Sequence, residues 1–214
     1  VPLLDNYDSV GFYNHASPNP ENPKTGTFNT IFFRNDRFEH LESGMFYVAE
    51  NERDTVKSWG AAYIRSCTWV KLKHKYSGEI LWVFNTHTDY EDTAEKPTAG
   101  MLLRKIEEIA KGSRALLMGD LNFGPWSSYD VLNDSDLLDD SYDVAEIKLE
   151  EKNVITYNAT YAHENIERKD HLDYIFVTDP NSVLQYDVLQ DQYEYDGEMR
   201  YPSDHFPVVI KIKL

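Results

Sequence analysis

Residues 80–86 read ILWVFNT and continue into His87, Thr88 and Asp89. The stretch 80–84 is apolar on both alternating faces, which is typical of a central strand that is covered on both sides. The polar residues that follow place reactive groups directly at the end of this strand, at the rim of a rigid scaffold. The segment therefore predicts a buried sheet with chemistry at one end.

Three further polar clusters stand at the ends of apolar strands. They are Gly119-Asp120-Leu121-Asn122, His171-Leu172-Asp173-Tyr174 and Pro202-Ser203-Asp204-His205-Phe206-Pro207. Any one of them alone is typical of a turn or of a structural histidine. Four clusters that all offer carboxylate, amide or imidazole groups favour a shared site.

The side chains in these clusters suit metal-assisted hydrolysis. Asp120 and Asn122 alternate with Leu121 and therefore project to one side of an extended segment. Carboxylate and amide oxygens are hard ligands that suit Mg²⁺ or Mn²⁺. The imidazoles of His87 and His205 supply a proton-transfer group and a donor to developing negative charge. Together these groups indicate hydrolysis of a phosphate ester with a divalent metal.

Predicted strands outnumber predicted helices along the chain. We expect strands over residues 10–13, 27–34, 37–48, 64–73, 79–86, 114–118, 172–178, 183–190 and 206–213. Residues 35–36 are expected to form a hairpin turn between the second and third of these strands. Helices are expected over 98–111, stopped by Gly112, and over 127–132, capped by Ser127. This order favours two packed sheets with a few helices outside.

Length and composition place the chain among globular domains. Its 214 residues fit one large domain, and we expect a single domain over 1–214. No apolar run approaches the roughly 20 residues of a membrane span. Cys67 is the only cysteine, so an intrachain disulfide and a cysteine-based zinc site are excluded. A cytoplasmic, reducing compartment is expected, although a signal peptide ahead of Val1 would change that expectation.

The charge balance bears on the partners. Lys and Arg number 21 against 37 Asp and Glu, which gives a formal net charge of −16. A strongly acidic surface repels phosphate backbones, so strong binding to duplex nucleic acid is not expected. A small anionic substrate that is bridged by a metal remains compatible with this charge.

In this order, the four clusters resemble the endonuclease/exonuclease/phosphatase superfamily, and in particular an uncharacterised bacterial branch of metal-dependent hydrolases. The motifs that carry the resemblance are Asn85-Thr86-His87, Gly119-Asp120-Leu121-Asn122 with Pro125, Leu172-Asp173-Tyr174-Ile175-Phe176-Val177 and Ser203-Asp204-His205-Phe206-Pro207-Val208. The resemblance covers almost the whole chain. It implies a four-layered α/β sandwich, in which two mixed β-sheets pack face to face with helices outside.

The resemblance also implies roles for the site residues. Asp120 would orient or deprotonate the attacking water, with Asn122 beside it on the phosphate or the metal. His205 would contact the scissile phosphate and be oriented by Asp173. His87 would donate a hydrogen bond to the phosphate or assist the leaving group.

Metal binding is implied for Asp204, directly or through water, together with Asp120 and Asn122 on Mg²⁺ or Mn²⁺. Relatives begin with a strand–helix–strand unit that supplies a glutamate metal ligand, and this sequence has no place for that unit before Tyr7. We therefore expect an N-terminally incomplete domain with impaired activity, unless another residue such as Asp89 replaces the missing ligand.

Three residues are candidate substrate contacts. Arg65 and Arg34 are each expected either to clamp a phosphate or to form a surface ion pair. Trp126 is either a stacking wall or a packed core residue. Tyr90 stands where the bacterial branch often has a histidine, which puts a role at that position in doubt.

The function expected from these observations is divalent-metal-dependent phosphoester hydrolysis, on a small or lipid-like substrate in preference to duplex DNA. A nuclease acting on DNA or RNA is one alternative. A binding module that keeps the fold without catalysis is another, and metal-dependent turnover of a phosphate ester would separate it from the enzyme.

Overall fold

The computed structural model describes residues 4–13, 28–123, 128–151, 154–158 and 170–214. Its largest sheet has six strands in the order β3 (Phe38–Tyr47), β4 (Ser66–His74), β5 (Ile80–Thr86), β6 (Ala115–Asp120), β9 (Asp173–Val177) and β7 (Asp139–Asp140). Strands β5 and β6 run parallel, and the other neighbours are antiparallel. The sheet is therefore mixed, and the strand predicted over 79–86 lies inside it.

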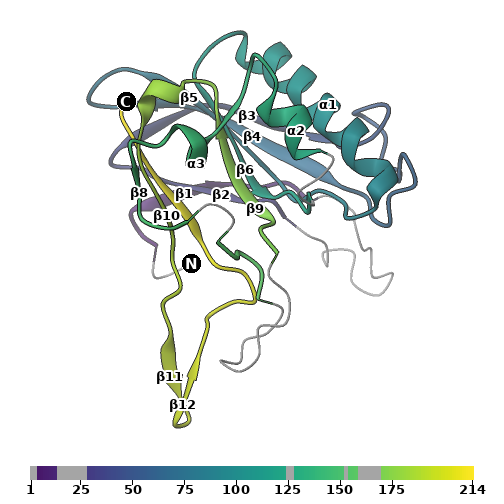
Figure 1. Cartoon of the computed structure of the whole chain (residues 1–214). Coiled ribbons are helices and arrows are strands. Elements are labelled where there is room, and N and C mark those ends of the chain that lie inside the picture. The colour runs from purple at the N-terminus through teal and green to yellow at the C-terminus, as the bar shows by residue number, and fades with distance from the viewer. Residues whose placement is uncertain (1–3, 14–27, 124–127, 152–153, 159–169) are drawn as a thin grey trace.

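Helices α1 (Asp92–Ala110) and α2 (Tyr129–Asn133) cover one face of this sheet (Figure 1). Leu102 and Ile106 of α1 are fully buried against the sheet. The helix begins earlier than the predicted residue 98, because Pro97 is accommodated inside it. Asp92 and Glu95 in the first turn favour this start, since acidic side chains stabilise a helix N-terminus.

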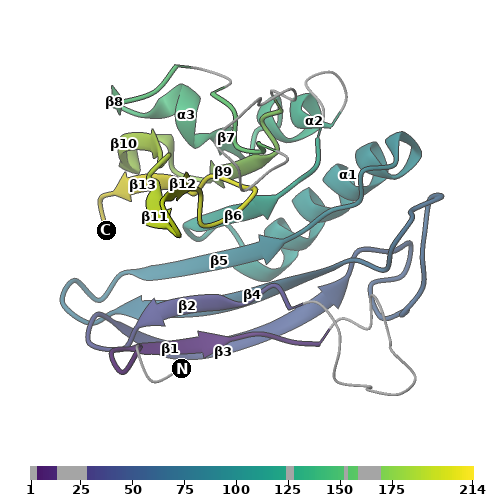
Figure 2. The same ribbon diagram turned by 90° about the horizontal axis from the view of Figure 1, so that it is seen from below.

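The opposite face of the sheet carries two smaller sheets, which Figure 2 shows from a second direction. One pairs β1 (Tyr7–Val10) with β2 (Ile31–Arg34), and the other has the order β13 (Val208–Ile212), β10 (Val183–Val188) and β8 (Ile147–Lys148). Within the described residues, β2 and β13 each have a strand partner on one side only.

The predicted hairpin between residues 27–34 and 37–48 is wrong. Strand β2 pairs antiparallel with β1, and the turn after Arg34 carries the chain into the six-stranded sheet instead. The cause is the burial pattern of β2, whose Ile31 and Phe33 are buried while Phe32 is exposed. Its apolar side packs across the sheets onto Val70 and neighbouring side chains of β4 and β5.

The remaining elements are short. Helix α3 (Ser141–Val144) contacts β9 and β10, and a single 3₁₀ turn spans Pro180–Ser182. Strands β11 (Tyr193–Tyr195) and β12 (Glu198–Arg200) form a hairpin that extends away from the body of the protein (Figure 1). This hairpin is not among the predicted strands, although Asp196-Gly197 is a strong signal for a two-residue turn.

The fold is mixed α/β with several sheets and few helices, as expected. The finer four-layered arrangement is not fully visible, because Figure 1 shows no helix on the outer side of β1 and β2 in the part of the chain that the structure describes. The short helix predicted from Ser127 begins after Ser128, and Ser127 itself lies outside the described residues. Among the helices of the described ranges, none is long and apolar enough to cross a membrane.

At Gly119 the backbone of β6 lies directly against Thr86 at the end of β5. Its φ of +135° lies in a region that residues with a side chain rarely adopt. A Cβ atom here would collide with the backbone carbonyl oxygen of Thr86. The residue type is therefore required for the two strands to approach each other directly before Asp120.

We predict that Gly119→Ala lowers the free energy of unfolding by at least about 3 kcal/mol, because both the collision and the backbone conformation are unfavourable. Gly78→Ala is the matched control. Gly78 also has a positive φ of +78°, but a Cβ atom added to it would meet nothing within 4 Å. Its replacement should cost only ~1–2 kcal/mol. Urea denaturation of the two variants measures the difference, and equal losses would contradict the prediction.

Candidate active site

Three strands of the large sheet and the loop before β13 bring the predicted residues to one edge of the sheet. Asp120 ends β6 and Asp173 begins β9, and the two are direct partners in the antiparallel register. His87 follows β5 directly, and His205 lies in the loop that leads into β13. Four side chains from distant parts of the sequence thus converge, as the four polar clusters predicted.

Asp120 is the centre of this group. Its Oδ2 lies 3.3 Å from His87 Nε2 and 3.8 Å from His205 Nε2. Burial, followed by the nearby charge of Asp173, raises the pKa of Asp120 to about 6. A carboxylate with such a pKa is mostly ionised at neutral pH and is still able to accept a proton in catalysis.

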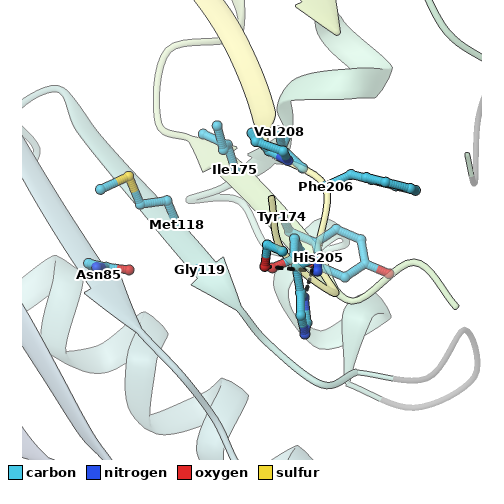
Figure 3. Close-up of a pocket in the computed structure, with 11 residues that line it drawn as sticks. Asn85, Met118, Gly119, Tyr174, Ile175, His205, Phe206 and Val208 are labelled. Atoms are coloured by element: carbon cyan, nitrogen blue, oxygen red, sulfur yellow. Dashed lines mark hydrogen bonds and ion pairs between the residues drawn. The ribbon is translucent and has the colours of Figure 1, made fainter. Parts of the chain in front are cut away.

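Asp173 orients His205. The Nδ1 atom of His205 lies 2.8 Å from Asp173 Oδ2, and this interaction is drawn in Figure 3. The hydrogen bond to Asp173 is the largest cause of a pKa of His205 above its usual value. A carboxylate that accepts from Nδ1 directs Nε2 outward, toward Asp120 and the open side of the site.

His87 is in a different electrostatic environment. Burial, followed by the positive charge of Arg65, lowers the pKa of His87 to about 4. Its imidazole is therefore neutral at neutral pH and donates from one nitrogen only. The pKa values of the two histidines that flank Asp120 are therefore shifted in opposite directions, and His205 is the one whose protonated form is favoured.

Asn122 closes the turn after β6. Its backbone N–H donates to Asp120 Oδ1 (3.0 Å), and its side-chain Nδ2 donates to the carbonyl of Thr88 (3.0 Å). Asn122 adopts a positive φ of +48°, a conformation that asparagine tolerates better than most residues. The residue fixes the Asp120 carboxylate and ties the strand end of β6 to the loop that carries His87.

Arg65 lies beside this group and is largely buried, with 10% of its side chain exposed. Its Nε is 3.5 Å from Asp89 Oδ2, and its charge acts on both His87 and Asp120. The sequence suggested that Arg65 either clamps a phosphate or forms a surface ion pair. The surface ion pair is wrong, because the pair with Asp89 is buried. The guanidinium is instead close enough to influence the pKa values of His87 and Asp120.

Asp89, which the sequence offered as a replacement metal ligand, is fully engaged by backbone donors. The N–H groups of Ala62 and Glu91 donate to its Oδ1, and that of Tyr63 donates to its Oδ2. Its side chain is only 2% exposed. The carboxylate therefore braces two loops, and these hydrogen bonds leave it poorly suited to hold a metal.

The other two candidate substrate contacts are not part of the group. Arg34 forms an exposed ion pair with Asp36 (2.6 Å) at the turn after β2, which is the surface alternative that the sequence left open. Its charge interacts with Tyr7 and Tyr76, away from the catalytic residues. Trp126, like Pro125, lies outside the described residues.

The sequence analysis missed two residues that support the site. The hydroxyl of Thr156 accepts from the backbone N–H groups of Leu172 and Asp173 (2.9 and 3.0 Å) and so fixes the start of β9. The ring of Tyr157 lies 4.8 Å from that of His205. Neither residue stands in a recognisable motif, because both act through contacts with segments that are remote in the sequence.

Among the described site residues, the side-chain atoms that suit a divalent metal are the oxygens of Asp and Asn. Within the described ranges, no group of three or more His, Cys, Asp or Glu residues is placed to hold a metal. Asp120 and Asn122 remain a chemically suitable pair, and Asp204 lies next to His205 and acts on its charge. A small number of protein oxygens fits Mg²⁺, which usually keeps several water ligands. The metal role of all three residues stays a prediction.

A groove that includes Asp173 and His205 in its lining adjoins the site (Figure 3). Eleven residues line it, including Asn85, Met118, Ile175, His205 and Val208. Both edges of β6 are paired, one with β5 and the other with β9. It is the face of β6, through the partly exposed Met118, that opens into this groove.

The opposite environments of the two histidines lead to a prediction for the metal-free protein. Asp173→Asn should lower the pKa of His205, because the carboxylate that stabilises its protonated form is lost. NMR titration of the imidazole protons measures this change, and His87 in the unsubstituted protein should titrate near 4. The signals of His40, on β3 at the far edge of the sheet, are the internal control. An unchanged His205 titration would contradict the assigned pairing.

Comparison with known proteins gives consistent results. A family model described as "Endonuclease/Exonuclease/phosphatase family" matches residues 5–205. Comparison with proteins of curated function finds no match to this chain. A solved structure of a mannosyl-6-phosphatase from Bacteroides thetaiotaomicron is 30% identical with a TM-score of 0.87, and the match covers 100% of this chain and 79% of that one.

Two further structures share the fold. An endonuclease/exonuclease/phosphatase family protein from the same bacterium is 30% identical with a TM-score of 0.86, over 99% of this chain and 76% of that one. The human Nocturnin catalytic domain is 20% identical with a TM-score of 0.72, over 99% and 74% of the two chains, and shows the fold alone. The extent of the family match and these neighbours lead to one conclusion: the chain belongs to the endonuclease/exonuclease/phosphatase family.

Proposed function

We propose that this protein hydrolyses the phosphate monoester of a small hydroxylated molecule, with a phosphorylated sugar as the favoured class, in the presence of Mg²⁺ or Mn²⁺. The observation that carries the proposal is the carboxylate of Asp120, whose pKa is raised to about 6. It lies between the imidazoles of His87 and His205, whose pKa values are shifted in opposite directions. The name of the 30% identical mannosyl-6-phosphatase supports the substrate class.

In this reaction, Asp120 accepts the proton of the water that attacks phosphorus. Its Oδ1 is fixed by Asn122, so the carboxylate keeps one orientation, and Oδ2 lies on the side of the two imidazoles. General-base assistance of this kind contributes typically ~10²–10⁴-fold to a rate. The outward-facing Nε2 of His205, whose ring is held by Asp173, donates to a phosphate oxygen as negative charge develops there.

His87 and Arg65 complete the binding of the phosphate. His87 is neutral and donates a hydrogen bond to an oxygen of the phosphate or of the leaving group. Arg65 adds a positive charge that burial has already partly desolvated. This desolvation lowers the pKa of the Arg65 guanidinium from its usual value. Charge-assisted hydrogen bonds from such a guanidinium are stronger than neutral ones.

A bound Mg²⁺ or Mn²⁺ supplies charge neutralisation at the phosphate, and Asp120, Asn122 and Asp204 are the residues that would hold it. Burial raises the pKa of Asp120 most, and the charge of Asp173 raises it further, so negative charge is unfavourable in this site. A cation that binds beside them relieves this repulsion.

A nuclease is the second candidate, since the family name includes nucleases. The net charge of −16 argues against tight duplex binding, which depends on neutralising many phosphates. A small substrate has one phosphate, and the site offers Arg65 and His205 for it. A non-catalytic binding module is disfavoured by the perturbed pKa values of Asp120 and His87, which typically mark catalytic groups.

We predict metal-dependent hydrolysis by the protein, because the described oxygens suit Mg²⁺ and Mn²⁺. A panel of sugar phosphates, phosphodiesters and oligonucleotides should show turnover of a sugar phosphate with either metal. EDTA should abolish it, and added metal should restore it. Calorimetry with Mn²⁺ gives a readout that is independent of activity. Full activity in excess EDTA, or a preference for oligonucleotides, would contradict the proposal.

We further predict that Asp120→Asn lowers kcat by roughly 100-fold or more, since the general base is lost. His205→Ala should lower kcat more than it raises KM, because its contact strengthens in the transition state. The fold should survive in both variants, as these side chains are 17% and 28% exposed at the rim of the sheet. Circular dichroism checks the fold.

Asp36→Asn is the control for these variants. It removes an exposed carboxylate whose partner is Arg34, away from the site, and surface ion pairs contribute little to stability. Its kinetic constants should equal those of the unsubstituted protein. A His205→Ala variant with unchanged kcat would refute the assignment of that residue.

A further inference from the structure

Two exposed tyrosines face each other close to the catalytic group. Tyr63 is 44% exposed and Tyr90 is 51% exposed. Their ring centroids are 6.0 Å apart at an interplanar angle of 65°, which is the edge-to-face arrangement favoured by aromatic pairs. They come from two different loops, one before β4 and one between β5 and α1, so the pair exists only in the folded protein.

Asp89 holds both loops in place. Its buried carboxylate accepts from the N–H of Tyr63 (2.9 Å) on one side and from the N–H of Glu91 (3.2 Å) on the other. The N–H of Ala62 adds a third hydrogen bond (3.0 Å). Three backbone donors on one carboxylate fix the loops that flank the tyrosines, so the rings are presented from a rigid support.

Contacts of Arg65 and Thr88 link the two tyrosine loops to Asp120. The guanidinium carbon of Arg65 lies 5.1 Å from the centre of the Tyr63 ring, and the charge of Arg65 acts on Asp120. The backbone N–H of Thr88, two residues before Tyr90, donates to the carbonyl of Asp120 (3.0 Å). A ligand whose phosphate contacts Arg65 therefore has the Tyr63 ring directly beside that contact.

Rigidly held aromatic rings that stay exposed at the edge of a polar site are typical of ligand pockets. Their burial would remove apolar surface from water, and each phenol also offers a hydroxyl. A sugar ring matches both properties, because it has an apolar C–H face and a rim of hydroxyl groups. An open-chain polyol presents no flat face to such rings.

We propose that Tyr63 and Tyr90 form a platform that binds the ring of the leaving group and makes ring-containing sugar phosphates the preferred substrates. The inference rests on the proposed phosphoesterase function and specifies its substrate class. Tyr90 is then a specificity-determining residue, at the position where the sequence resemblance left a role in doubt.

The test compares kcat/KM for mannose 6-phosphate and glycerol 3-phosphate in Tyr63→Ala, Tyr90→Ala and Tyr76→Ala. Loss of either ring of the platform should lower kcat/KM for mannose 6-phosphate about 10-fold, the equivalent of one or two aromatic contacts. The value for glycerol 3-phosphate should change less than about twofold. Tyr76, at 74% exposure in the turn between β4 and β5, is the matched control and should affect neither substrate.

Tyr63→Phe and Tyr90→Phe separate the platform from a purely structural role. Both should keep most of the activity toward mannose 6-phosphate, since the rings remain. Equal losses for both substrates in the alanine variants would show that the loops are merely disturbed and would overturn the platform. A selective loss on adenosine monophosphate, with mannose 6-phosphate unaffected, would overturn the sugar class.

Binding measurements provide a readout of the platform that does not depend on turnover. Calorimetry in an Asp120→Asn background with Mg²⁺ should show mannose 6-phosphate binding that weakens about 10-fold in Tyr90→Ala. Absence of hydrolysis by the unsubstituted protein on every substrate would overturn the proposed function alone. Unchanged binding in Tyr63→Ala and Tyr90→Ala would overturn the platform alone.

Discussion

Two carboxylates that face each other across adjacent strands determine the character of this site. Asp120 and Asp173 are register partners at the ends of β6 and β9, and the charge of Asp173 acts on Asp120 in a partly buried environment. Like charges at this proximity are unfavourable, so positive groups must balance them. His205 does so directly by bonding Asp173, and Arg65 does so from the side. Burial and the repulsion that remains together keep the pKa of Asp120 above its usual value.

The scaffold has to hold these groups against that repulsion. Strand pairing does most of this. Because β6 is hydrogen-bonded to β5 on one side and to β9 on the other, Asp120 is held beside Asp173. Gly119 permits the direct approach of β6 to Thr86, and Asn122 then ties the end of β6 to the loop of His87. Asp120 and Asp173 are therefore placed by the backbone geometry of paired strands, which positions side chains more accurately than a flexible loop would.

Much of this site could be predicted from the sequence, because polar clusters at the ends of apolar strands are local patterns. The convergence of His87, Asp120 and His205 followed from them. Partner choice between strands could not be predicted, since β2 joins β1 according to which face needs burial in the folded protein. The role of Asp89 was also hidden, because its hydrogen-bond partners at 62 and 63 lie in a loop without a motif.

A phosphate site on an acidic protein requires positive groups that act locally. Arg65 is buried beside Asp89, and the hydrogen bond to Asp173 raises the pKa of His205, so the favourable interactions of both groups are confined to their immediate neighbours. The formal charge of −16 on the chain then acts on everything that extends beyond the site. A polyanion meets repulsion along its whole length, whereas the leaving group of a sugar phosphate is uncharged. For such a neutral ring, contact with Tyr63 and Tyr90 is favourable where further phosphates would be repelled.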